Sequence, residues 1–114
     1  MASDRPAGAR IFSYEEAVAL LPEVRRLTEE AFRRVESLQR EAEGVGSAKA
    51  LEQRLNGIVN DWAQALIGRG VEVKGLWLAD FDNGSGYYCW RYPERSLQYY
   101  HSYEDGFQGR MRIQ

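Results

Sequence analysis

Cysteine and histidine are scarce in this sequence, which contains only Cys89 and His101. A single cysteine excludes an intrachain disulfide and a multi-cysteine zinc site. One histidine without a second nitrogen or sulfur ligand at metal spacing is weak evidence for a metal site. We therefore predict no metal and no cofactor, and we expect a reducing, cytoplasmic environment.

An excess of either charge is also absent, because 15 basic and 17 acidic residues leave a net charge of -2. This balance gives no electrostatic footprint for nucleic acid or for an anionic membrane. No apolar run is long enough to span a bilayer, and the segment 1–10 lacks the apolar core of a signal peptide. We expect no nucleic-acid partner and no membrane association.

What the sequence does contain fits one α+β domain of 114 residues. A chain of this size buries roughly two-thirds of its unfolded surface, which is enough for a core without disulfides. We divide it into a polar tail at 1–11, a helical hairpin at 12–69, and a β-meander with a C-terminal loop at 70–114. The predicted architecture is a long antiparallel helical hairpin packed on a three-stranded antiparallel β-meander.

The first helix is predicted to begin after Ser13, because Ser13 and Glu16 have the spacing of a capping box. It is expected to run to about Glu43, with a kink from Pro22 near 18–21. Its apolar positions alternate spacings of three and four, which is the heptad pattern typical of coiled coils. These positions are Leu21, Val24, Thr28, Ala31, Val35, Leu38 and Ala42.

A second amphipathic helix is predicted at 48–67, after a turn at 44–47 in which Ser47 is the N-cap. Gly68 and Gly70 are expected to end it. Two long helices joined by a short loop form an antiparallel hairpin. The apolar seam of this second helix is Leu51, Leu55, Ile58, Trp62, Ala65 and Leu66.

Aromatic and aliphatic runs predict three strands, at 75–81, 87–92 and 97–101. A two-residue turn at Asn83-Gly84 would place Trp77 opposite Trp90, and an even-length second loop would place Trp90 opposite Tyr99. One face of the sheet is then expected to pack on the hairpin, and a one-residue slip would reverse the assignment. The face packed on the hairpin would hold Trp77, Ala79, Phe81, Tyr88, Trp90, Tyr92, Leu97, Tyr99 and His101. The opposite face would hold Leu76, Leu78, Asp80, Tyr87, Cys89, Arg91, Gln98 and Tyr100.

Several short motifs resemble the bacterial DUF2203 family over about 11–114. The motifs are Phe12-Ser13-Tyr14-Glu15-Glu16-Ala17, Leu20-Leu21-Pro22, Gly70-Val71-Glu72-Val73-Lys74, Asp80-Phe81, Cys89-Trp90-Arg91, Glu94, His101, Asp105-Gly106-Phe107 and Gly109-Arg110. The chain departs from the family pattern at Met111-Arg112, where Gln-Pro is frequent, and at Tyr92-Pro93, where Leu-Gly is usual. The resemblance implies a cytoplasmic bacterial protein and assigns no chemistry.

Five polar residues are the candidates for a ligand site near the end of the sheet: Asp80, Arg91, His101, Asp105 and Arg110. His101 with Glu104 and Asp105 could bind a divalent metal or act as a general base, but a histidine at the rim of the aromatic core is the favoured interpretation. The loop 105–110 either binds an anion through Arg110 or is a turn whose arginine pairs with Asp105 or Glu104.

Cys89 is interpreted as a small, semi-buried residue. On the predicted register it points away from His101, which argues against a Cys–His nucleophile pair. No catalytic residue is predicted.

We predict a non-enzymatic interaction or scaffolding module that acts as a homo-oligomer, most simply a dimer, with an unidentified protein partner. The dimer is expected because one hairpin covers only one face of the sheet and leaves apolar residues on the other. The competing explanation is that the C-terminal segment 102–114 folds back and covers part of that face. The alternative is a small-molecule or metal-binding protein, or an enzyme. That alternative requires Arg91, His101, Asp105 and Arg110 to converge on one pocket.

Overall fold

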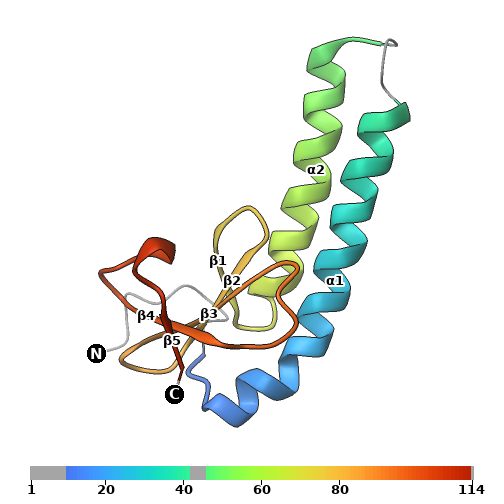
Figure 1. The fold of residues 1–114 in the computed structure, drawn as a ribbon. Helices are drawn as coiled ribbons and strands as arrows, with labels where there is room; N and C mark the ends of the chain where they lie inside the picture. Colours follow the sequence, from blue (N-terminus) through green and yellow to red (C-terminus); the bar gives the residue numbers. More distant parts are fainter. Residues whose placement is uncertain (1–9, 42–45, 114) are drawn as a thin grey trace.

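The computed structural model describes residues 10–41 and 46–113, so that residues 1–9 of the tail predicted at 1–11 and the loop residues 42–45 lie outside it. Within this part of the chain, two helices precede a five-stranded antiparallel sheet whose strand order follows the sequence (Figure 1). The elements are α1 (Tyr14–Glu41), α2 (Ala48–Ile67), β1 (Glu72–Gly75), β2 (Leu78–Asp82), β3 (Gly86–Arg91), β4 (Tyr99–Ser102), a short 3-10 helix η1 (Phe107–Gly109) and β5 (Met111–Arg112). The α+β class is confirmed, whereas the three-stranded sheet is wrong.

Both helices begin at the side chains that the sequence indicated. The Ser13 and Glu16 backbone N–H groups donate to each other's side chains, at 2.8 and 3.1 Å, which is a complete capping box. Ser47 accepts the Ala50 N–H at 3.0 Å and caps α2. The first turns of α1 run at an angle to the rest of the helix, as expected for a helix that contains Pro22 (Figure 1).

The core lies between the lower half of the helix pair and one face of the sheet (Figure 1). Ala79, Phe81 and Trp90 are fully buried on that face. A buried hydrogen bond joins the helices, because the Trp62 indole donates to the Thr28 hydroxyl at 2.8 Å. The predicted core face is therefore confirmed for β2 and β3.

The predicted strand at 75–81 is interrupted, which accounts for one of the two additional strands. A turn at Leu76-Trp77 separates β1 from β2, and Trp77 has a positive φ of 64°. This backbone conformation is unfavourable for a bulky residue. The Trp77 ring packs edge-on against Trp62 and Phe32, with ring centroids 5.0 and 5.8 Å away, and this packing offsets the backbone cost.

The predicted pairing of β2 with β3 is wrong by two residues. Ala79 lies opposite Trp90 and Phe81 opposite Tyr88, because the connecting loop is longer than the two residues expected. The Asn83 N–H donates to the Gly86 carbonyl at 2.9 Å across that loop. A shift of two residues leaves each side chain on its predicted face.

The predicted pairing of β3 with β4 is wrong by one residue, and this error has the larger consequence. Tyr87 lies opposite His101 and Cys89 opposite Tyr99, so that Tyr99 and His101 move to the face that carries Asp80. The connection is irregular, with a turn at 91–94 and the Leu97 side chain buried from outside any strand. Side chains alternate between the two faces only within a regular strand, and this alternation is lost in such a loop. The register of β4 therefore could not be inferred from the residues of the loop.

The C-terminal segment folds back over this second face. It passes through η1 and returns as β5, which pairs with β4 at Tyr99 and Arg112. Cys89 and Tyr87 on the second face are consequently buried within a single chain, at 1% and 9% exposed. This cover is the alternative to a dimer that the sequence left open.

Candidate functional site

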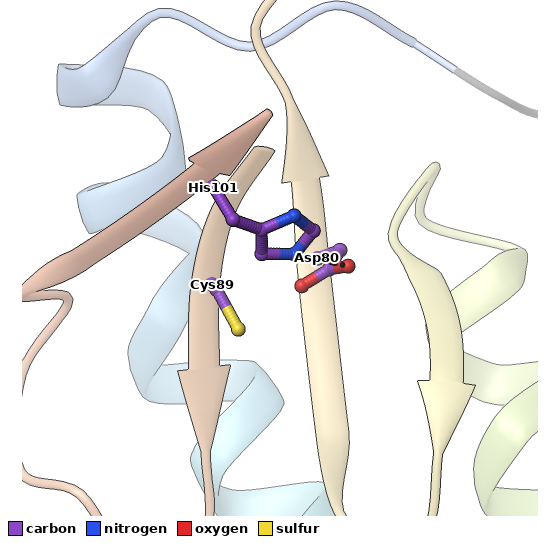
Figure 2. A group of neighbouring side chains, drawn as sticks. All are labelled: Asp80, Cys89 and His101. Atoms are coloured by element: carbon purple, nitrogen blue, oxygen red, sulfur yellow. Dashed lines mark hydrogen bonds and ion pairs between the residues drawn. The ribbon is translucent and has the colours of Figure 1, made fainter. Parts of the chain in front are cut away.

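Three neighbouring strands each contribute one side chain to a buried cluster. Asp80 comes from β2, Cys89 from β3 and His101 from β4, and Figure 2 shows the three side chains gathered on the same side of the sheet. Their oxygen, sulfur and nitrogen atoms all lie within 4.8 Å of one another. The residues are 1%, 1% and 3% exposed. The expectation that Cys89 points away from His101 is therefore wrong.

Both ring nitrogens of His101 face oxygen acceptors. Nδ1 lies 2.8 Å from the Ser102 carbonyl oxygen, and Nε2 lies 3.0 Å from Asp80 Oδ2. A carbonyl can only accept, so Nδ1 carries an N–H, and Nε2 either carries a second N–H that donates to Asp80 Oδ2 or presents a lone pair to it. Two acceptors facing each other need a positive charge between them, supplied either by a proton or by a metal ion.

The second carboxylate oxygen of Asp80 has no hydrogen-bond partner among the described residues. Buried polar atoms are nearly always paired, and a buried carboxylate that lacks partners is costly. Burial raises the pKa of Asp80, although His101 and Cys89 oppose the rise. The cluster thus holds an oxygen that the described part of the fold leaves unsatisfied.

Cys89 is not arranged as a nucleophile. Burial raises the pKa of its thiol to about 12, with a further contribution from the Asp80 charge, whereas a reactive cysteine needs a lowered pKa. His101 cannot serve as its base, because both of its ring nitrogens face other partners. The triad does not support acyl-transfer chemistry.

A pocket of about 150 Å³ opens onto the cluster. Its walls come from the sheet and from the segment between β4 and η1. It is lined by Lys74, Leu78, Asp80, Tyr87, Cys89, His101, Tyr103, Glu104, Asp105, Gly106 and Phe107. A volume of this size admits a few waters or one small molecule next to the three buried donor atoms.

The structure brings some of the predicted site residues together and separates others. Asp80, His101 and Asp105 line the same pocket. Arg110 lies beside it, with its guanidinium 4.0 Å from the Tyr99 ring centroid. Arg91 is exposed and does not line the pocket, so the four-residue convergence required of the alternative function is met only in part.

Cys89 is the site residue that sequence reasoning missed. It was set aside because the inferred strand register placed it on the wrong side of His101. Its spacing from Asp80 does carry a usable signal, since Asp80 and Cys89 lie opposite each other across a recognisable hairpin. Phe107, which also lines the pocket, belongs to the Asp105-Gly106-Phe107 motif, whereas Tyr87 shows no distinguishing sequence pattern.

Fold and site together define an α+β protein that carries a buried Asp–Cys–His cluster beneath a small pocket. The chain belongs to the DUF2203 family, described as "Uncharacterized conserved protein", whose model matches residues 10–113. No curated protein and no solved structure matches it. Among the described residues, neither helix is apolar over a length that could cross a membrane.

Proposed function

We propose that this protein binds one divalent transition-metal ion, of the zinc class, through Asp80, Cys89 and His101. The observation that carries the proposal is the cluster itself, three buried donor atoms within 4.8 Å of one another. Carboxylate oxygen, thiolate sulfur and imidazole nitrogen are the ligands that Zn²⁺ takes in proteins. A cation there would bind the Asp80 oxygen that lacks a hydrogen-bond partner among the described residues. It would also take the place of the proton between Asp80 and His101.

The hydrogen bonding around His101 also supports a metal ligand. Histidines that bind metals almost always donate their other ring N–H to a carboxylate, a carbonyl or a water. Here Nδ1 is held by the Ser102 carbonyl at 2.8 Å, which leaves Nε2 for the ion. The ligand atoms come from three hydrogen-bonded strands, so the backbone that carries them is rigid.

Three protein ligands beside a pocket leave a coordination position for water or a small molecule. That arrangement is typical of catalytic zinc sites, whereas structural zinc sites are closed by four protein ligands. The chemistry that a bound ion would supply is polarisation of a small ligand or activation of a water. This proposal departs from the sequence-based prediction of no metal. It develops the alternative function instead, a metal-binding protein with a polar site near the end of the sheet and the C-terminal loop.

The interaction-module function and the homo-oligomer stay predictions. Their main argument, an uncovered second face, is weakened because the C-terminal segment covers Tyr87 and Cys89. What supports self-association now is a set of large apolar side chains that remain exposed. These are Ile11, Tyr14, Val18, Leu76, Tyr103 and Met111. The cytoplasmic, bacterial setting implied by the family resemblance is likewise a prediction.

Titration calorimetry of metal-depleted protein with Zn²⁺ tests the metal proposal. We expect one Zn²⁺ per chain for the wild type, and a loss of that binding in Asp80→Asn and Cys89→Ser. Glu104→Gln is the matched control, because Glu104 is an exposed acidic residue that lines the same pocket outside the cluster. It should bind Zn²⁺ as the wild type does.

Circular dichroism checks that each variant keeps its fold. Zn²⁺ should also raise the melting temperature of the wild type, because a ligand at 100 times its Kd stabilises a folded protein by about 2.7 kcal/mol. A wild-type protein that takes up no Zn²⁺, Co²⁺ or Fe²⁺ would overturn the proposal. So would equal Zn²⁺ binding by Asp80→Asn and the wild type.

A further inference from the structure

The Arg110 side chain is fixed by several contacts, unlike an arginine that is exposed on the surface. Its guanidinium lies between two aromatic rings, 4.0 Å from the centroid of Tyr99 and 4.1 Å from that of Phe107. Its Nη1 lies 2.9 and 3.1 Å from the two carboxylate oxygens of Glu94. The Arg110 side chain is 14% exposed. These contacts fix both the position and the plane of the guanidinium.

The fixed guanidinium lies next to the cluster. Tyr99, on which it stacks, is the residue opposite Cys89 in the β3–β4 ladder. The ion pair with Glu94 uses one terminal nitrogen, and an arginine has further N–H donors in the same plane. Phe107, the second ring against Arg110, lines the pocket that opens onto the cluster, so the guanidinium lies between a residue paired with Cys89 and a residue of the pocket wall.

We propose that Arg110 is the positioning residue of the metal site, which orients the Cys89 sulfur and offsets its charge when that sulfur is bound to the ion. This inference rests on the proposed metal binding. The Ser102 carbonyl holds the metal ligand His101 by a hydrogen bond from outside the coordination sphere. Arg110 would hold the ligand Cys89 in the same way. The site would therefore depend on the C-terminal segment, although all three ligands belong to the sheet.

A purely structural role is the competing explanation, since Arg110 also pins the C-terminal segment to the sheet. The two roles differ in what they change. A structural role affects the free energy of unfolding, whereas a positioning role affects how the sulfur binds the metal. Sulfur ligation can be read separately, because Co²⁺ bound to a thiolate gives a sulfur-to-metal charge-transfer band in the near ultraviolet.

The experiment is a Co²⁺ titration of the full chain followed by absorption, with Arg110→Met, Arg110→Lys and Arg112→Met. Outer-sphere substitutions usually weaken metal binding about 10–100-fold, and we expect that loss in Arg110→Met together with a weaker charge-transfer band per bound Co²⁺. Arg110→Lys keeps the positive charge and should recover part of both. Arg112→Met is the matched control, since Arg112 lies 5.7 Å from the same Tyr99 ring centroid and hydrogen-bonds Gln98.

Wild-type affinity and band intensity in Arg110→Met would overturn the inference and leave the metal proposal standing. Absence of Co²⁺ binding in the wild type would instead overturn the proposed function, and this inference with it. If Arg110→Met does not fold, Arg110→Lys is compared alone with the wild type. An unchanged affinity and band in that variant would count against the positioning role.

Discussion

Asp80 is a charged residue in a place where stability alone would favour an apolar one. It is 1% exposed, and one of its oxygens has no partner among the described residues. Replacing a buried ion pair by apolar residues is often neutral or stabilising, so that burial of such a pair is weak evidence of a structural role. Sites that depart from the rules of a stable core are where function is expected.

We expect Asp80→Asn to leave the stability of the metal-free protein within about 1 kcal/mol of the wild type. The reason is that the asparagine amide can donate to His101 Nε2, which the carboxylate cannot do unless a proton is added. Urea denaturation in the presence of a chelator measures this. A loss of about 3–5 kcal/mol would show instead that Asp80 and His101 form a structural ion pair.

Thr28 has a different role, because its hydroxyl links the two helices. The hydroxyl accepts from the Trp62 indole at 2.8 Å and donates to the Val24 carbonyl at 2.7 Å. Thr28→Val should cost about 1–3 kcal/mol, since the indole N–H is left buried without a partner.

A double-mutant cycle with Trp62→Phe isolates this effect. In the Trp62→Phe background the N–H is absent, so Thr28→Val should cost distinctly less than it does in the wild type. Urea denaturation measures the loss of stability caused by Thr28→Val in each background. Equal losses in the two backgrounds would show that the Thr28–Trp62 hydrogen bond does not stabilise the helix pair.

Local residue patterns predicted the helix starts but not the site. A hydrogen bond between Ser13 and Glu16 depends on three residues of sequence, and both it and the Ser47 cap are confirmed. The meeting of Asp80 with His101 depends on the register across an irregular loop. One residue of error there moves a side chain to the opposite face of a sheet.

At the scale of elements, the C-terminal segment decides how accessible the cluster is. Phe107 lines the pocket and contacts Arg110, and Cys89 beneath the segment is 1% exposed. Phe107→Ala removes the ring that covers this side of the pocket. We expect it to speed the reaction of Cys89 with a thiol reagent by about tenfold, if opening the segment becomes about 1.4 kcal/mol easier.

Met111→Ala is the control for that measurement, because Met111 belongs to the same segment but is 59% exposed. It should react at the wild-type rate. Equal labelling rates for Phe107→Ala and the wild type would mean that Cys89 is reached by another route, and that the C-terminal segment does not control access.

The elements themselves were predicted unevenly, and the differences have physical causes. The range 48–67 predicted for the second helix coincides with α2, because a cap, a continuous seam and glycines define both ends. The strand at 75–81 was not continuous, because the packing of Trp77 stabilises a turn that its own backbone preference opposes. β5 has two residues, too few to show any periodicity.

At the scale of the whole molecule, the dimer can be tested by mass. If the exposed apolar side chains of α1 and the sheet edge associate, light scattering at micromolar concentration should give about twice the chain mass of 13.1 kDa. Leu76→Arg, at a position 57% exposed, should shift the population toward monomer if the β1–β2 turn takes part. A wild type that stays monomeric at high concentration would end the dimer prediction.

Asp80, Cys89 and His101 are proposed to hold one metal ion together. X-ray absorption at the zinc edge of the Zn²⁺-loaded protein tests it most directly, because it counts the donor types around the ion. We expect one sulfur at about 2.3 Å and the remaining donors, nitrogen and oxygen, at about 2.0–2.2 Å. Cys89→Ser should lose the sulfur shell. A wild-type spectrum with no sulfur, or with only the water oxygens of a loosely held surface ion, would show that the three residues do not bind the ion together.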